Sequence, residues 1–223
     1  MGARALEFSD SYGGYRQRLV EQLQAKGIRD LAVLRAVSAI PRHRFVPDSV
    51  RHRAYEDSAL PIAAGQTISQ PWVQARSLQE LALTGREKVL EVGAGSGYQT
   101  ALLSQLAFSV VAVERVAVLA ASARTAINDL GIRNVVVMVG DGTLGWRSLA
   151  PFDAMVVAAA SPAVPGPLIE QLAEGGRMVI PVGDRDEQTL IRVDKTASGI
   201  KTTPLSDVRF VPLLGELGWR DGG

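Results

Sequence analysis

The chain has 223 residues, 47% of them hydrophobic, which is enough for one substantial domain with a sizeable core. Its 24 basic and 23 acidic residues give a net charge of +1, so no overall field draws nucleic acid or anionic lipid to it. Cysteine is absent, which excludes disulfides and thiolate nucleophiles, and the two histidines have no acid spaced as a metal partner. No apolar run suggests a membrane span or a secretory signal, so a cytoplasmic protein is expected.

The first third of the sequence predicts three helices and one irregular connection. The helices are expected over residues 15–26, 30–39 and 70 or 71 to 83. Gly27 and Pro41 follow the first two as residues that end helices, and Asp30 can cap the start of the second. The connection, residues 42–68, is rich in proline and arginine, and its two histidines, His43 and His52, are expected on a solvated basic surface or in a structural turn.

Short apolar runs and helical stretches alternate through the rest of the chain. The predicted strands are residues 89–92, 110–113, 135–139, 154–158, 177–182, 190–193 and 208–213, and the predicted helices are residues 99–106 and 116–130. This alternation predicts an α/β fold with a Rossmann-like, doubly wound and mostly parallel sheet, preceded by the helical extension. The last strands follow one another too closely for parallel crossovers, so antiparallel pairing is expected there.

The expected organisation has three parts within one compact unit. Residues 1–84 form the helical and substrate-loop extension, residues 85–215 the cofactor-binding core, and residues 216–223 a tail.

A glycine loop follows the first strand of the predicted core. Residues 89–92 are a buried-strand pattern that stops at Gly93, Gly95 and Gly97, where backbone can approach a ligand closely. The next strand ends at Glu114, which is placed to accept hydrogen bonds from a ribose diol. These features predict a nucleoside-binding half-fold.

The glycine spacing separates two classes of nucleoside cofactor. A dinucleotide fingerprint would need its third glycine at position 98, where this chain has Tyr98. The closer spacing, with Glu91 two residues before the first glycine, resembles the first motif of S-adenosylmethionine-dependent methyltransferases. An anionic Glu91 beside the loop would suit a ligand that carries an ammonium and a sulfonium, whereas it would repel a pyrophosphate.

Two later loops bear on the cofactor and on the acceptor. In Gly140-Asp-Gly, Asp141 could accept a hydrogen bond from an exocyclic amine and the backbone at Gly142 could meet a purine edge, although the sequence is also that of an ordinary turn. The loop over residues 159–162, Ala-Ala-Ser-Pro, has nothing that stacks on a base or holds an amino group, as methyltransferases of base amino groups require. A methyl acceptor that carries its own negative charge would need neither a stacking side chain nor a group that holds an amino group.

The segment Gly65 to Pro71, which contains Gln-Thr-Ile-Ser, carries the most specific resemblance. With Pro-Arg-His-Arg-Phe-Val-Pro, the glycine loop, Gly140-Asp-Gly and Val208-Arg-Phe-Val-Pro-Leu, it closely resembles the protein-L-isoaspartate O-methyltransferase family over about residues 15–215. The resemblance implies methyl transfer from S-adenosylmethionine, giving S-adenosylhomocysteine, to the α-carboxylate of L-isoaspartyl residues in damaged proteins and peptides. The ester then cyclises to a succinimide, which hydrolyses partly to aspartate. It also implies that Ser69 contacts the acceptor carboxylate, with Gln66, Thr67 and Ile68 beside it.

A carboxylate acceptor also suits the residues that are present. It is ionised at pH 7, so it needs no general base, and catalysis would consist mostly of positioning. Isoaspartyl sites occur in many sequences, so the peptide would be held through its backbone. The predicted strand around residues 209–213, with Val211, could present an edge for such pairing or could be a sheet strand without ligand contact.

Three alternatives stay open at this point. A related carboxyl methyltransferase could act on an aspartate of a dedicated peptide. An NAD-linked oxidoreductase is opposed by Tyr98 and Glu91, and a catalytically silent module would bind the nucleoside without methyl transfer. The expected partners are damaged proteins and peptides, with no nucleic acid, membrane or metal, and the chain is expected to act as a monomer.

Overall fold

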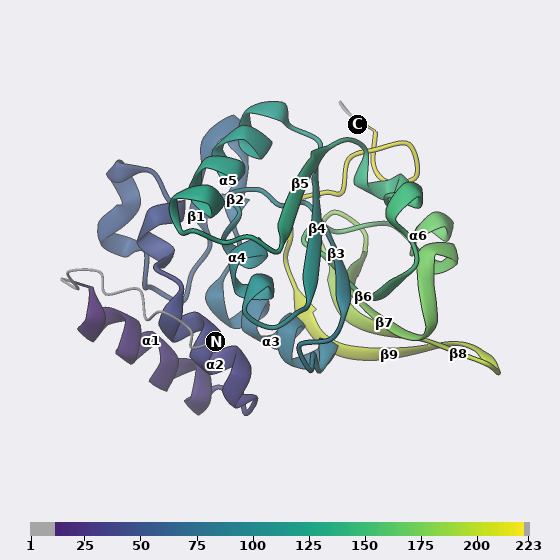
Figure 1. Cartoon of the computed structure of the whole chain (residues 1–223), viewed down its shortest axis with the longest axis horizontal. Coiled ribbons are helices and arrows are strands. Elements are labelled where there is room, and N and C mark those ends of the chain that lie inside the picture. The colour runs from purple at the N-terminus through teal and green to yellow at the C-terminus, as the bar shows by residue number, and fades with distance from the viewer. Residues whose placement is uncertain (1–11, 221–223) are drawn as a thin grey trace.

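Runs of valine, leucine and alanine form the buried centre of a seven-stranded sheet (Figure 1). The computed structural model describes residues 12–220 of the chain. Five strands are parallel: β3 (Lys88–Val92), β4 (Ser109–Glu114), β5 (Val135–Val139), β6 (Phe152–Val157) and β7 (Leu172–Gly183). The strand order is β5-β4-β3-β6-β7-β8-β9, so the order reverses between β3 and β6. In such sheets ligands bind beyond the carboxyl ends of the strands at this reversal.

The last two strands are antiparallel, which confirms the expectation for this end of the sheet. β8 (Gln188–Thr196) pairs with β7, and β9 (Gly199–Val208) pairs with β8. The strand predicted over residues 208–213 is wrong, because β9 ends at Val208 and an extended segment follows it. The turn between Thr196 and Gly199 sets the register of β9, a polar edge strand that a search for apolar runs misses.

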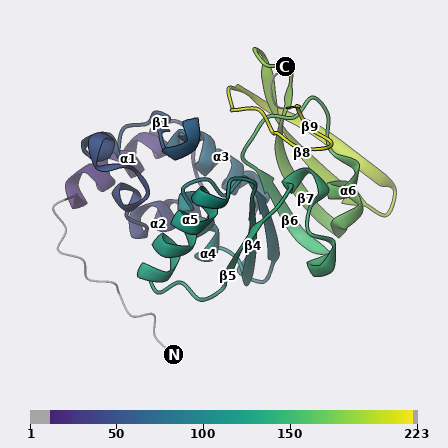
Figure 2. The same cartoon turned by 90° about the horizontal axis from the view of Figure 1, so that it is seen from above.

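Five helices lie on one side of the sheet, with α1 and α2 packed on the helices next to the strands, and a short helix lies on the other side (Figure 2). The first group is α1 (Gly13–Ala25), α2 (Leu31–Ala39), α3 (Pro71–Leu81), α4 (Tyr98–Ser104) and α5 (Ala117–Asp129). All five were predicted within a few residues, and the carboxylate of Asp30 accepts the backbone N–H groups of Ala32 and Val33 as a cap should. The sixth, α6 (Gly166–Gln171), was not predicted, since six residues with two glycine or proline positions give no helical period.

The connection over residues 42–68 is more ordered than its composition predicts. It holds three short 3-10 helices, Arg42–Phe45, Asp48–Arg53 and Ala63–Gly65, the last within a small hairpin of β1 (Leu60–Pro61) and β2 (Thr67–Ile68). The ring of His43 stacks on Tyr12 with centroids 4.2 Å apart, so His43 belongs to a structural turn, whereas His52 is exposed. A structural turn and a solvated surface were the two settings expected for these histidines.

One buried hydrophobic cluster joins the helical extension to the sheet. It contains Leu23 and Leu34 from the first two helices, Leu78 from α3, and Val89 and Val156 from the central strands. At the other end, Trp219 donates its backbone N–H to Leu213 and its indole N–H to Ala160. The cluster thus spans the expected boundary near residue 84, the bonds of Trp219 span the one near residue 216, and residues 221–223 lie outside the described residues.

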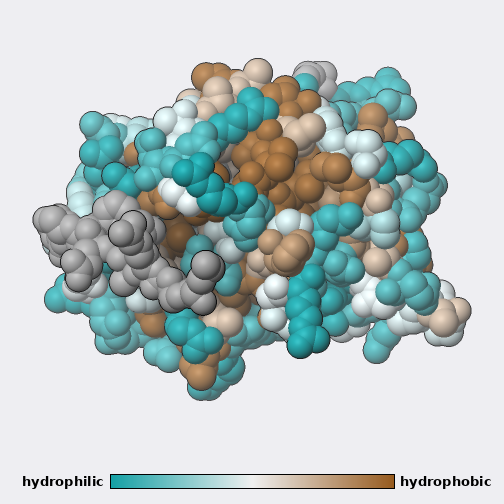
Figure 3. Space-filling view, in the orientation of Figure 1, coloured by the Kyte–Doolittle hydropathy of each residue, from teal (hydrophilic) through white to brown (hydrophobic). Residues whose placement is uncertain are grey.

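β5 is the exposed edge of the parallel strands. Its Val136 side chain is 53% exposed, and Figure 3 shows hydrophobic residues gathered over this part of the face. The guanidinium of Arg124 donates to the backbone carbonyl of Val137, at 3.0 Å from Nε and 2.7 Å from Nη2. Because this contact occupies an edge acceptor, it hinders pairing with a strand from another chain.

Candidate active site

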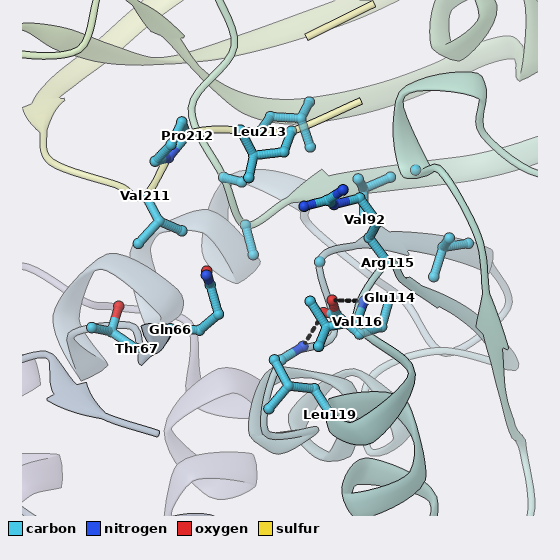
Figure 4. A pocket seen from close by; sticks show the side chains of 17 residues that line it. Gln66, Thr67, Val92, Glu114, Arg115, Val116, Leu119, Val211, Pro212 and Leu213 are labelled. Atoms are coloured by element: carbon cyan, nitrogen blue, oxygen red, sulfur yellow. Dashed lines mark hydrogen bonds between the residues drawn. The ribbon is translucent and has the colours of Figure 1, made fainter. Parts of the chain in front are cut away.

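Two adjoining pockets lie beyond the carboxyl ends of the central strands. The first, drawn in Figure 4, is lined by the glycine loop, the end of β4 and the loop after β6. The second is lined by the start of α3, the segment before β1 and the chain that follows β9. Thr67 and Val211 line both pockets, so a ligand in one would lie next to a ligand in the other.

The three glycines of the loop have different reasons to be glycine. All three adopt positive φ, +88° at Gly93, +54° at Gly95 and +86° at Gly97, which side chains disfavour. Gly93 and Gly95 line the first pocket. Gly97 does not, and a Cβ there would lie 3.0 Å from the Cβ of Ala123 on α5. The expectation of close backbone approach to a ligand therefore fits the first two, whereas Gly97 allows helix packing.

Glu114 ends β4 at the rim of the first pocket. Its side chain accepts the backbone N–H of Gly95 and that of Val116, each at 2.8 Å, the two bonds drawn in Figure 4. These bonds hold both carboxylate oxygens beside the glycine loop, where each oxygen keeps a second lone pair for a ligand hydroxyl. The placement fits the predicted role in binding a ribose diol.

Glu91 lies beneath the loop and does not line the first pocket. It is fully buried, and one carboxyl oxygen accepts the hydroxyl of Thr100 on α4 at 2.5 Å, while Oε1 has no partner among the described residues. Burial raises the pKa of Glu91 to about 8, although the hydrogen bond from Thr100 opposes this shift. The idea of an anionic Glu91 facing a cationic ligand is therefore corrected, because the desolvated carboxyl favours its neutral form.

Asp141 has a structural task that the sequence did not reveal. Its Oδ1 accepts the backbone N–H and the hydroxyl of Thr143, and its Oδ2 accepts the backbone N–H of Glu216 at 2.8 Å. Its carboxylate is thus engaged in tying the chain after β9 to the loop after β5. Gly142 does line the first pocket, and a Cβ there would collide with Val92.

The acceptor segment is divided between the pockets and the core. Gln66 and Thr67 line the first pocket, Ser69 lines the second, and Ile68 is only 3% exposed and packs into the core. Strand alternation explains this division, since neighbouring side chains of β2 point to opposite faces. The buried Ile68 fixes the residues on either side of it.

Asp57 fixes the chain just after Ser69, and sequence reasoning assigned it no role. Its carboxylate accepts the backbone N–H of Trp72 in the first turn of α3 at 2.8 Å, and its Oδ2 lies 2.6 Å from the Nζ of Lys26. Its backbone carbonyl accepts the side-chain amide of Gln70. Asp57 therefore acts as a helix cap from a distant part of the chain, which no local pattern discloses.

Val211 belongs to the extended segment that separates the pockets. Its carbonyl accepts the backbone N–H of Ala160 at 2.8 Å, and the N–H of Leu213 donates to the carbonyl of Ala160 at 2.7 Å. These bonds use one side of the segment to hold it against the loop after β6. The backbone edge expected around residues 209–213 thus belongs to an irregular segment and not to a sheet strand.

Comparisons with known proteins agree with this geometry. The family model described as protein-L-isoaspartate(D-aspartate) O-methyltransferase matches residues 15–218. The chain is 50% identical over 205 residues to protein-L-isoaspartate O-methyltransferase 1 of Syntrophobacter fumaroxidans, a match that covers 92% of this chain and 96% of the relative. It is 52% identical over 206 residues to protein-L-isoaspartate O-methyltransferase 2 of Geotalea uraniireducens, covering 92% and 95%. This chain belongs to the protein-L-isoaspartate(D-aspartate) O-methyltransferase family.

Solved structures of the family share the fold. A protein-L-isoaspartate O-methyltransferase superposes with a TM-score of 0.83 at 29% identity, covering 91% of this chain and 67% of that one. A second, from Plasmodium falciparum and in complex with S-adenosyl-L-homocysteine, superposes with a TM-score of 0.79 at 28% identity, covering 89% and 98%. The fold and the family inferred from the sequence motifs are confirmed.

The methyltransferase fold brings together most of the residues that the sequence singled out. Those that line the two pockets are Gln66, Thr67, Ser69, Gly93, Gly95, Glu114, Gly142 and Val211. Those that support the pockets without lining them are Ile68, Glu91, Gly97 and Asp141. In residues 12–220 no helix is long and apolar enough to cross a bilayer, and no cluster of histidine and acidic residues forms a metal site.

Proposed function

We propose that this protein transfers the methyl group of S-adenosylmethionine to the α-carboxylate of L-isoaspartyl residues in damaged proteins and peptides. The observation that carries the proposal is the pair of adjoining pockets in a member of this family, with Ser69 in one pocket and the glycine loop in the other. The product ester is poised to cyclise to a succinimide, whose hydrolysis returns part of the residue to aspartate.

The chemistry needs orientation more than acid or base. A carboxylate oxygen attacks the methyl carbon, the carbon–sulfur bond breaks, and its electron pair returns to sulfur to give neutral S-adenosylhomocysteine. No proton moves in this step, because the carboxylate is ionised at neutral pH. The chain therefore contributes by aligning oxygen, methyl carbon and sulfur, which can supply on the order of 7 kcal/mol or more.

The pocket-lining residues divide into two groups of roles. For the cofactor, the proposed residues are Glu114 for the ribose diol and Gly93, Gly95 and Gly142 as backbone that lies close to it. For the acceptor, Ser69 donates its hydroxyl to one carboxylate oxygen while Gln66, Thr67 and Val211 form the wall between the two ligands. The location of Thr67 and Val211 in both pockets supports this division. Asp141 acts on the cofactor through the backbone it holds, and Glu91 through its bond to the hydroxyl of Thr100 on α4.

The setting proposed for this activity follows from its reactants. S-adenosylmethionine is a cofactor of the cell interior, so we propose a cytoplasmic protein. The near-zero net charge of +1 supports a protein that does not associate with nucleic acid.

We also propose a monomer, supported by the Arg124 contact that occupies the β5 edge. Light scattering at micromolar concentration would test the monomer, and a dimer mass would contradict it.

The activity is tested by transfer of labelled methyl to an isoaspartyl peptide, its aspartyl twin and a set of small carboxylic acids. The proposal expects label in the isoaspartyl peptide alone, released by mild base as expected for a methyl ester. Label confined to one aspartyl peptide would favour the dedicated-peptide alternative. Cofactor binding without transfer to any carboxylate would favour a silent module.

A further inference from the structure

A buried arginine links the two halves of the site. Arg42 is fully buried, and it donates hydrogen bonds of 3.0 Å to the side-chain oxygen of Gln74 and to the backbone carbonyl of Ser69. Its guanidinium carbon lies 4.9 Å from the ring centroid of Tyr98, the residue after the glycine loop. Arg42 does not line either pocket, so it contacts the acceptor segment from behind.

The positive charge of Arg42 is poorly compensated by the part of the chain that the structure describes. No carboxylate of residues 12–220 forms an ion pair with it, and Nε has no hydrogen-bond partner there. The carboxylate with the strongest electrostatic effect on it is that of Asp57, which already pairs with Lys26. Burial lowers the pKa of Arg42 to about 10, which still leaves it protonated at neutral pH.

An uncompensated buried cation is costly unless another charge approaches it. The open pocket on the far side of Ser69 is where a substrate carboxylate would come closest. Through the poorly solvated interior, the attraction between the Arg42 guanidinium and a carboxylate in this pocket is weakened less than it would be in water. A neutral acceptor of the same shape would gain nothing from this charge.

We infer that Arg42 is a positioning residue that fixes the Ser69 peptide group and makes the second pocket selective for an anionic acceptor. The inference rests on the proposed carboxylate acceptor. It separates two effects. The hydrogen bond to Ser69 aligns the acceptor and affects turnover. The charge favours the bound carboxylate more than the transition state, in which that carboxylate has lost part of its negative charge, so cancelling the charge should raise KM without lowering kcat.

The sharpest test is Gln74→Glu, which leaves Arg42 in place. The new carboxylate would take the position of the Gln74 amide oxygen and pair with the guanidinium, cancelling its charge while the bond to Ser69 remains. We expect KM for an isoaspartyl peptide to rise about 5- to 30-fold with kcat not lowered. Affinity for S-adenosylhomocysteine should stay within about 2-fold of wild type.

A binding measurement separates this charge effect from a merely structural one. The affinity of an isoaspartyl peptide is compared with that of its α-carboxamide analogue, each in the presence of S-adenosylhomocysteine. Wild type should prefer the carboxylate, and Gln74→Glu should reduce that preference about 5-fold or more. Loss of packing alone would weaken both peptides equally. Gln79→Glu is the matched control on the same helix, since the Gln79 side-chain oxygen accepts only the backbone N–H groups of Arg29 and Asp30.

Arg42→Lys provides the complementary variant, which keeps the charge and loses the paired hydrogen bonds. It should retain the preference for the carboxylate while kcat falls. An unchanged KM and an unchanged preference in Gln74→Glu, with wild type active, would overturn the inference about Arg42. A wild type that methylates no isoaspartyl peptide would instead overturn the proposed function.

Discussion

The carboxylate of Glu114 accepts the backbone N–H of Gly95 at 2.8 Å, which ties the end of β4 to the loop that follows β3. The second oxygen accepts the N–H of Val116, where α5 begins. One side chain therefore sets the spacing of two segments at the strand-order reversal. The loop is held in place by this bond before any cofactor arrives.

This arrangement predicts that even the mild substitution Glu114→Gln impairs cofactor binding. Both carboxylate oxygens accept backbone N–H groups, so an amide would set its own NH2 against one of these donors. We expect affinity for S-adenosylhomocysteine to fall about 10- to 100-fold, measured by calorimetry. Glu170→Gln, on an exposed surface pair with Arg147, is the control and should bind normally. Normal binding by Glu114→Gln would contradict the assigned role.

Ser69→Ala tests the acceptor half of the site. Removing the hydroxyl leaves the carboxylate without its orienting donor, so turnover of an isoaspartyl peptide should fall about 10- to 10³-fold. The cofactor lies in the other pocket, so its affinity should change little. Steady-state methylation and a parallel binding titration measure the two quantities, and an unchanged turnover would refute the role.

Gly97 and Gly85 form a matched pair for separating backbone strain from crowding. Their φ angles are nearly equal, +86° and +88°, but a Cβ at Gly97 would lie 3.0 Å from Ala123 whereas nothing lies within 4 Å of one at Gly85. Gly85→Ala should lower the free energy of unfolding by about 1 kcal/mol through strain alone. Gly97→Ala should lose about 1 to 3 kcal/mol more, because α4 and α5 must separate. Equal losses in denaturant unfolding would show that the packing reason is wrong.

Glu91 predicts a pH dependence of stability. Burial raises its pKa from 4.5 to about 8, so the folded state holds a proton that the unfolded chain has already released between these values. Stability from this group is complete below about pH 4.5 and is lost as the pH rises through about 8. Glu91→Gln keeps an oxygen that accepts the Thr100 hydroxyl but cannot ionise. The free energy of unfolding of this variant should therefore rise relative to that of wild type as the pH increases, by on the order of a few kcal/mol at about pH 8. If the free energies of unfolding of the two proteins changed in parallel with pH, the raised pKa of Glu91 would be contradicted.

The fold was predictable because its signals are local. The run Val-Leu-Glu-Val stops at a glycine loop, and Asp30 stands directly before an amphipathic stretch, so strand, loop and helix cap are each written in adjacent residues. The acid at the end of the second core strand pointed to Glu114, and the family resemblance pointed to Ser69; both line the pockets. The edge strand β9 escaped this kind of reasoning because its pairing depends on a turn and not on an apolar run.

The parts of the site that the sequence could not supply depend on contacts between distant residues. Arg42 lies among arginines and histidines that suggest a solvated surface, and its contacts with Ser69 and Gln74, 27 and 32 residues away, show that it is buried support. Asp57 caps a helix that begins 14 residues later, and Asp141 holds Glu216, 75 residues away. An acid beside a ligand loop can thus serve the protein instead of a ligand, as Glu91 also does through the Thr100 hydroxyl.

The most direct test follows an isoaspartyl peptide through repeated turnover by chromatography, with and without S-adenosylmethionine. The account predicts that the peptide is consumed only with the cofactor, that a succinimide forms, and that the aspartyl peptide then accumulates. This sequence requires the methyl group to be placed on the α-carboxylate beside the backbone amide that closes the ring. An isoaspartyl peptide that is never consumed, or one that is esterified without any aspartyl product, would contradict the account.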